Sequence, residues 1–155
     1  MQPLVFLLFV AVINVGVCQK STCDVNWHFY EDTCLLYEPG GLPWREARAV
    51  CKYLDATLVE IRTHDVNNVM TGYADGFNSE CVWLGGNDLF EEGDWKWEGS
   101  RTQLSFTNWH RGKPNKGDND EDCLSMSRDL GYLWSDRNCD YKCSFICTKR
   151  ARGRG

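Results

Sequence analysis

The chain has 155 residues and a formal net charge of −5, with 17 Lys and Arg against 22 Asp and Glu. This length suits one domain with its own core. Four basic residues lie at positions 149–154, so the rest of the chain carries about −9. That balance disfavours nucleic acid as a partner of the domain body. The sequence contains no nucleophile elbow, zinc signature or phosphate-binding glycine loop, so an enzyme is not expected.

Residues 1–18 have the character of a secretory signal peptide. They contain no charged side chain, and Leu4 to Val17 is almost wholly apolar. Such a run is shorter than the roughly 20 residues that cross a bilayer, but it suits the apolar region of a signal. We therefore expect cleavage before Gln19, a secreted soluble product without a membrane span, one domain over 19–148 and a basic tail over 149–155.

The cysteines support export. The chain has nine, and removal of Cys18 leaves an even number. An even set in an exported chain of this size predicts a disulfide framework. A zinc site is less favoured, because no Cys-x-x-Cys occurs and the histidines are not paired at ligand spacing. The remaining cysteines are Cys23, Cys34, Cys51, Cys81, Cys123, Cys139, Cys143 and Cys147.

The first half of the domain contains the helical patterns. Residues 23–34 are typical of a short extended hairpin, and 33–37 continue as a strand. Apolar residues at helical spacing predict an amphipathic helix over 43–54, with a proline in its first turn. A second helix is expected after Asp65, with its end at Gly76.

The second half contains short strands separated by loops rich in Gly, Asn and Asp. Strands are expected over 81–84, 95–97, 123–126 and 141–147. A long loop lies near 105–122, and loops of that length inside a domain are usually functional or disordered. Two helices followed by several short strands indicate an α+β domain.

Eight motifs follow one another in a specific order along the chain: Trp44 to Cys51, Trp83-Leu84-Gly85-Gly86, Trp95-Lys96-Trp97, Phe106 to Trp109, Lys113-Pro114-Asn115, Glu121-Asp122-Cys123, Trp134-Ser135-Asp136 and Phe145-Ile146-Cys147. On these motifs the chain resembles a C-type lectin-like domain of the long form over roughly residues 23–147. The resemblance implies an α+β fold of two helices, short antiparallel sheets and a long loop region, cross-linked by disulfides. The chain is also similar to molluscan perlucin-like proteins, which are associated with the calcified shell matrix.

The family pattern also implies how the cysteines pair. It joins Cys51 to Cys147 and Cys123 to Cys139, and the long form adds a bridge from Cys23 to Cys34. This leaves Cys81 with Cys143. The tryptophans of the motifs are expected in the core and as anchors of loops rather than as a platform for sugar stacking.

Sugar-binding members of the family hold one calcium ion in the long loop, and two sugar hydroxyls complete its coordination. The carboxylates and amides that bind the metal also bond those hydroxyls, so Asn115, Glu121 and Asp136 are the candidate carbohydrate ligands. Pro114 matches the residue that follows a cis peptide bond in the family. The resemblance places five residues at the metal positions: Lys113, Asn115, Glu121, Ser135 and Asp136.

Two of these positions depart from the family pattern. Lys113 cannot bind a metal, because an ammonium group has three donors and no lone pair. Ser135 offers a shorter, uncharged hydroxyl. Two outcomes stay open: calcium binding is retained but weakened, since ligand number and charge tune affinity, or Lys113 forms a salt bridge with Glu121 or Asp136 and fills the metal position.

A second, structural calcium position of the family follows the Trp-Leu-Gly strand. Asp88 and Glu92 match its spacing, and Glu121 and Asp122 supply the other side. Lys116 replaces a further acidic ligand. Asp118, Asn119 and Asp120 of the same loop are candidates to substitute for it, although acidic loops are more often solvated.

The function implied by the resemblance is a secreted domain that binds extracellular carbohydrate with weakened calcium dependence. The alternative is a calcium-independent component of an extracellular or shell matrix that binds no sugar. One fold serves both roles, so the fold alone does not decide between them. The expected partners are extracellular glycans or matrix components.

Overall fold

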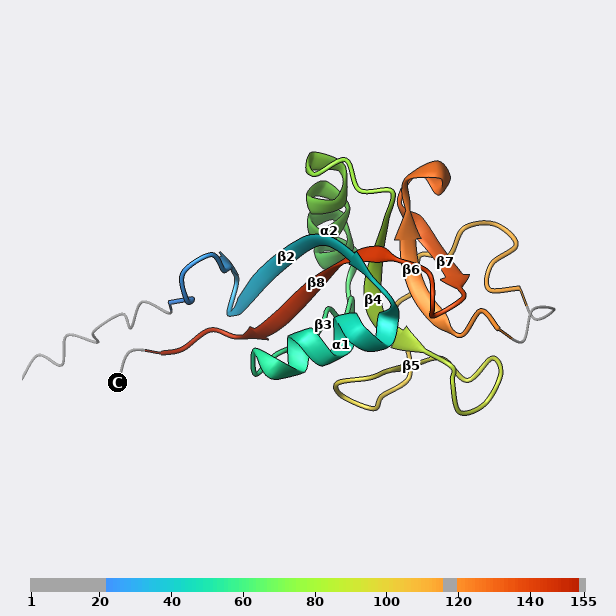
Figure 1. Ribbon diagram of the computed structural model, residues 1–155, viewed down its shortest axis with the longest axis horizontal. Helices are drawn as coiled ribbons and strands as arrows, with labels where there is room; N and C mark the ends of the chain where they lie inside the picture. Colours follow the sequence, from blue (N-terminus) through green and yellow to red (C-terminus); the bar gives the residue numbers. More distant parts are fainter. Residues whose placement is uncertain (1–21, 116–119, 154–155) are drawn as a thin grey trace, which may run out of the picture.

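The computed structural model describes residues 22–115 and 120–153. The expected signal peptide, residues 1–18, lies outside the described residues, as do Lys116 and Arg154. The described part of the chain contains two α-helices, one 3-10 helix (Arg128–Leu130) and eight strands, and its two ends lie at the same end of the molecule (Figure 1). Among the described residues no helix is long and apolar enough to span a membrane.

All strands belong to one eight-stranded sheet with the order β1-β2-β8-β4-β6-β7, in which β3 pairs with β8 and β5 with β4. The predicted α+β fold class is confirmed. The short antiparallel sheets that the resemblance implied are joined into one sheet, because β4 and β8 pair in parallel, with Val82 opposite Ser144. The bounds are β1 (His28–Tyr30), β2 (Thr33–Leu42), β3 (Thr57–Leu58), β4 (Cys81–Asn87), β5 (Lys96–Trp97), β6 (Cys123–Ser127), β7 (Leu133–Arg137) and β8 (Cys143–Arg150).

The first helix, α1 (Trp44–Tyr53), forms where the sequence predicted it. It buries Trp44, Ala47 and Cys51, which lie on one face at helical spacing. The indole Nε1 of Trp44 donates to the Leu84 carbonyl oxygen at 2.8 Å, so the helix is fixed to β4 through a satisfied polar contact.

The second helix, α2 (His64–Gly76), also confirms its prediction and ends at Gly76. Thr63 caps its first turn, since its side chain accepts a hydrogen bond from the Val66 N–H at 3.3 Å. Asn67 on this helix is buried and accepts a 2.9 Å bond from Trp134 Nε1 on β7. In Figure 1, α1 and α2 lie on opposite sides of the long β2–β8 ribbon.

The four implied disulfides are present: Cys23–Cys34, Cys51–Cys147, Cys81–Cys143 and Cys123–Cys139. Their Cα atoms lie 5.1 to 5.6 Å apart, within the range of natural bridges. One bridge ties α1 to β8, and another ties the start of β4 to the start of β8. The disulfide framework is therefore confirmed.

The glycine pair of the Trp-Leu-Gly-Gly motif allows β4 to pack closely on its neighbours. A Cβ atom at Gly85 would lie 2.8 Å from the Leu58 carbonyl oxygen, and one at Gly86 would lie 2.6 Å from Leu124 Cδ2. Any larger residue would therefore push β4 away from β3 or β6. This close packing places the carboxyl end of β4, with Asn87 and Asp88, beside the long loop.

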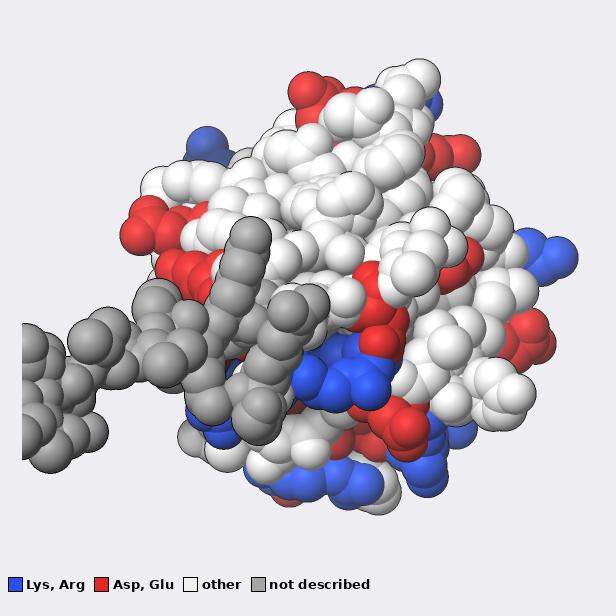
Figure 2. Space-filling view, turned by 90° about the vertical axis from the view of Figure 1, so that its left-hand side faces the viewer, with Lys and Arg blue, Asp and Glu red and all other residues white. Residues whose placement is uncertain are grey.

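The expected basic tail begins later than position 149. Strand β8 continues to Arg150, and Lys149 pairs with Asp24 at 2.8 Å while lying 4.2 Å above the Trp27 ring. Arg152 also pairs with Asp24. Figure 2 shows this end of the molecule, where positive and negative side chains lie interspersed below a broad area without charge. These cations are thus partly neutralised by the domain itself.

Candidate functional site

The long loop is anchored at its start to β7. The His110 N–H donates to the Trp134 carbonyl oxygen at 2.8 Å, and the Trp134 N–H donates to the Asn108 carbonyl oxygen at 2.8 Å. Trp109 and Trp134 therefore pair as an isolated parallel bridge. This anchoring brings the Lys113-Pro114-Asn115 segment next to Asp136, which lies two residues farther along the same strand.

A cluster of aromatic rings packs around the pairing of Trp109 with Trp134. The Trp109 ring lies 5.0 Å from Trp95 and 6.0 Å from Trp134, in edge-to-face arrangements. Trp97 also packs edge-to-face on Trp134, at 6.0 Å. Trp83, Trp97 and Trp134 are fully buried. The prediction that the motif tryptophans form core and loop anchors is confirmed by this packing.

The ammonium group of Lys113 lies among the predicted ligand oxygens. Its Nζ donates to Asn115 Oδ1 at 2.8 Å and to Glu121 Oε2 at 2.9 Å. It also forms an ion pair with Asp136 Oδ1 at 2.8 Å. The peptide bond between Lys113 and Pro114 is cis, as the resemblance implied. One cation of the chain thus contacts three of the predicted ligands at once.

Both carboxylate oxygens of Asp136 take part in this network. Its side chain is only 2% exposed, Oδ1 faces the Lys113 ammonium, and Oδ2 accepts the Asn115 backbone N–H at 2.7 Å. Oδ1 has no well-aligned hydrogen-bond donor among the described residues, so the ion pair is what neutralises it. Asp136 therefore holds the loop against β7 as well as balancing the lysine.

Ser135, the other departure from the family pattern, is also turned inward. It is 4% exposed, and its hydroxyl donates to the Asp136 backbone carbonyl oxygen at 2.7 Å. The hydroxyl is thus used within the strand. Its role as a metal ligand stays a prediction.

The electrostatics of the site keep Lys113 charged. Burial alone would lower the pKa of this lysine, but hydrogen bonds and charge from Asp136 and Glu121 outweigh burial and raise the pKa above its ordinary value. The side chains of Lys113 and Glu121 keep 23% and 26% of their exposure. The ammonium is therefore a permanent cation at neutral pH that still reaches solvent.

This arrangement does not fit a calcium ion. Calcium needs six to eight oxygens at about 2.3–2.6 Å. An ion in contact with Asn115, Glu121 and Asp136 would occupy the space of the ammonium, which touches an oxygen of each at 2.8 to 2.9 Å. The sequence left two outcomes open, weakened calcium binding or a lysine in the metal position. This geometry agrees with the second.

The second predicted metal position has the opposite character. Asp88 is 4% exposed, and its Oδ2 accepts the Gly93 N–H at 2.8 Å while its Oδ1 is buried without a hydrogen-bond partner among the described residues. Burial raises the pKa of Asp88 to about 6, and the nearby charges of Glu92 and Asp122 add to the effect. Burial likewise raises the pKa of Asp122, followed by the charge of Asp120.

These acidic residues lie near one another, but their side chains do not surround a common point. The Asp88 N–H donates to the Asp122 backbone carbonyl oxygen at 3.1 Å, which joins the two loops. Within residues 22–115 and 120–153, however, no group of three or more His, Cys, Asp or Glu side chains is arranged to hold a metal ion. The ligand roles of Asp88, Glu92 and Asp122 stay predictions, and candidates 118 and 119 lie outside the described residues.

A cleft of about 350 Å³ opens beside Lys113, and the sequence did not identify five of its nine lining residues, among them Arg137 and Tyr141. Arg137 lies 4.5 Å above the ring of Tyr141, which is 43% exposed. The only sequence signal for them was their position just after the Trp-Ser-Asp motif and before the last strand. The cleft is lined by Lys113, Glu121, Asp129, Leu130, Ser135, Asp136, Arg137, Asn138 and Tyr141.

The family model described as "Lectin C-type domain" matches residues 41–149, which includes the whole region just described. The chain belongs to the C-type lectin domain family. It is 37% identical to perlucin of Haliotis laevigata over 132 residues, which cover 82% of this chain and 83% of perlucin. The perlucin likeness expected from the motifs is therefore confirmed.

Solved structures of C-type lectin folds superpose on the chain as well. The carbohydrate-recognition domain of cow CD23, crystallised in the presence of a GlcNAc2Man3 oligosaccharide, has a TM-score of 0.77 and 28% identity, and the match covers 86% of this chain and 99% of that one. A calcium-independent type II antifreeze protein gives a TM-score of 0.77 at 24% identity, over 86% of this chain and 98% of that one. The second likeness shows the fold alone.

Proposed function

We propose that this chain is a secreted binding module that recognises extracellular carbohydrate without calcium, through the cleft beside Lys113. The observation that carries the proposal is the Lys113 ammonium at 2.8 to 2.9 Å from Asn115, Glu121 and Asp136. It supplies the positive charge that a metal supplies elsewhere in the family. The sequence predicted weakened calcium dependence, and our proposal goes further, to independence of calcium.

The cleft has the chemistry to bond hydroxyl groups directly. Lys113 provides ammonium donors and Glu121 provides carboxylate acceptors, and both are about a quarter exposed. Their mutual ion pair holds them in place, so little side-chain entropy is lost when a ligand binds. The half-exposed ring of Tyr141 offers an apolar surface beside them.

Secretion is supported by the disulfides, which form and persist in oxidising compartments. Carbohydrate as the ligand is supported by the CD23 structure, a relative crystallised with an oligosaccharide. A role as a non-enzyme is supported by the relatives, which are lectins. The cleft acts by binding alone and takes part in no chemical step.

A second candidate is a calcium-independent matrix protein that binds no sugar. It is favoured by the same ion pairs, because Lys113 satisfies the oxygens that would otherwise bond sugar hydroxyls. Likeness to perlucin is compatible with either role. The two candidates differ in a single observable, retention on glycans.

A glycan array probed in calcium and again in chelator tests the proposal. Glycan retention is expected to be equal in both buffers and to fall in the Glu121→Gln variant, which keeps the size of the side chain but removes its charge. Lys142→Met, at an exposed lysine outside the cleft, is the matched control and is expected to bind normally. Retention lost in chelator contradicts calcium independence, and absence of retention in both buffers favours the matrix role.

A further inference from the structure

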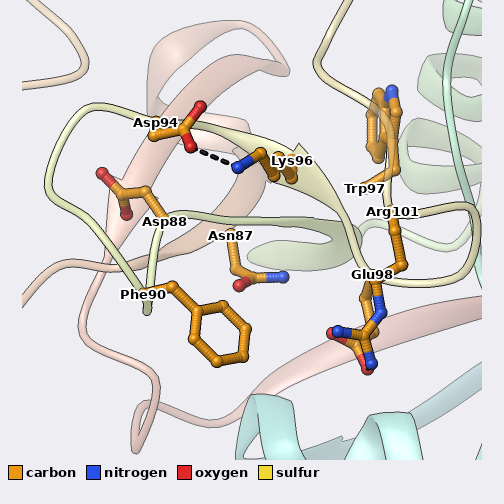
Figure 3. A pocket seen from close by; sticks show the side chains of 8 residues that line it. All are labelled: Asn87, Asp88, Phe90, Asp94, Lys96, Trp97, Glu98 and Arg101. Carbon is orange, nitrogen blue, oxygen red and sulfur yellow. Dashed lines mark hydrogen bonds and ion pairs between the residues drawn. The ribbon is translucent and has the colours of Figure 1, made fainter.

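A second hollow, of about 340 Å³, lies on a different part of the molecule from the Lys113 cleft and shares no lining residue with it. It is formed where β4 ends and β5 begins, beside the loop 88–94 (Figure 3). Its volume is in the range of small-molecule sites. The lining residues are Asn87, Asp88, Phe90, Asp94, Lys96, Trp97, Glu98 and Arg101.

Asn87 forms the floor of this hollow with an unused amide. The residue is 4% exposed, and its side chain makes no hydrogen bond to any other described residue. Figure 3 shows the amide turned into the space between the Phe90 ring and the Glu98 side chain. Its carboxamide offers two donors and an acceptor to the solvent of the hollow. The amide is therefore placed to bond a ligand.

Phe90 forms the opposite wall. It is 84% exposed, one of the most exposed large apolar side chains among the described residues. Figure 3 shows its ring beside the Asn87 amide rather than packed on the core. A flat, solvent-facing ring next to a polar floor suits a ligand with one apolar face and several hydrogen-bonding groups.

Four of the five charged side chains in the lining already have partners. Lys96 pairs with Asp94, and Glu98 pairs with Arg48 and, at 3.7 Å, with Arg101. The fifth, Asp88, is buried with its Oδ1 unpartnered among the described residues, which disfavours an anionic ligand. A neutral ligand keeps the existing ion pairs intact.

We propose that this hollow binds a neutral pyranose residue of a glycan, with the C–H face of the ring on Phe90 and its hydroxyls on the Asn87 amide. The site uses neither Lys113 nor a metal ion. This proposal is independent of the function proposed above, because the two sites share no lining residue. Either site can bind sugar when the other does not.

The test is an NMR titration of the full domain with methyl β-glucopyranoside in chelator. A ligand of this size is expected to bind with a dissociation constant on the order of 1 mM. The amide signals of Asn87, Phe90 and Glu98 should shift together and saturate. Phe90→Ala should weaken binding at least about fivefold, whereas Tyr53→Ala, at an equally exposed aromatic residue on α1, should leave it unchanged.

Asn87→Ala is the second variant and should abolish the saturable shift, with the unchanged dispersion of its spectrum showing that it is folded. Unshifted signals at these residues in the wild type overturn the proposal, as does equal binding by Phe90→Ala. Shifts caused by N-acetylphenylalaninamide but not by the glucoside overturn it too, because they assign the hollow to a protein side chain.

Discussion

The two positions at which the family pattern predicts calcium have opposite electrostatics. At the first, the chain carries its own cation, and Lys113 neutralises Glu121 and Asp136. At the second, Asp88 is buried with an oxygen that has no partner among the described residues, and its pKa is raised to about 6. The first position is complete without a metal, whereas the second keeps a negative group that no described side chain neutralises.

The difference shows what a single substitution can do to a metal site. A lysine at a ligand position removes one oxygen and also supplies the charge for which the remaining oxygens were arranged. The loop is then held by ion pairs of the chain itself. Within residues 22–115 and 120–153 no cation pairs with Asp88, so burial of its charged form lowers the stability of the folded protein by an amount that depends on pH.

Reversing the lysine should have the largest effect. Lys113→Glu together with Ser135→Asn is expected to tighten calcium affinity at least about tenfold relative to the wild type, since it removes a repulsive charge and adds a carboxylate (tenfold is about 1.4 kcal/mol). Isothermal titration measures the change. An affinity equal to that of the wild type would mean that the loop does not fold around a metal as the family pattern implies.

Neutralising the lysine should lower the stability of the protein. Lys113→Met leaves Asp136 buried without a cation, and is expected to lower the free energy of unfolding by about 1–3 kcal/mol in chelator, less than for a fully buried pair because Lys113 and Glu121 are partly exposed. Denaturant unfolding checks this. Lys142→Met is the control and should change the free energy of unfolding by less than about 0.5 kcal/mol. If Lys113→Met lowers the free energy of unfolding by an equally small amount, the ion pairs of Lys113 contribute little to stability.

The effect expected at the second position depends on pH and reaches its full size only above about pH 6. Because the pKa of Asp88 is raised on folding, its protonated form stabilises the protein below pH 4, and this contribution is lost as pH rises through about 6. The Asp88→Asn side chain stays neutral at every pH. In chelator, the free energy of unfolding of this variant should therefore exceed that of the wild type by roughly 1–3 kcal/mol at pH 7.5 and equal it near pH 3.5. Asp140→Asn, at an exposed site, is the control, and its stability relative to the wild type should not depend on pH in thermal unfolding. If the stability difference between Asp88→Asn and the wild type is the same at every pH, the account of a buried charge at Asp88 is contradicted.

Much of the fold could be predicted because it depends on local patterns. The bounds of both helices agree within about two residues, since apolar spacing, Thr63 and Gly76 define them locally. Strands β3 and β7 and the parallel pairing of β4 with β8 were missed. β3 is two residues long, and the pairing joins segments about 60 residues apart, which no local pattern records.

The site was predicted in its location but not in its arrangement. The motifs located Lys113, Asn115, Glu121 and Asp136 together, as the structure has them. Whether the lysine would enter the ligand cluster or point to solvent depends on how the 113–115 loop lies on β7, which is fixed by the Asp136 contact with the Asn115 N–H. The pairing of Arg137 with Tyr141 is likewise tertiary and had no sequence motif.

The most direct test is a calcium titration of the wild-type domain followed by NMR at Asn115 and Asp136. If the Lys113 ammonium takes the place of the metal, these signals should not shift as calcium rises through the millimolar range, even if signals near Asp88 do. Saturable shifts at Asn115 and Asp136 with a dissociation constant below about 1 mM, the weak end of extracellular calcium sites, would contradict the account.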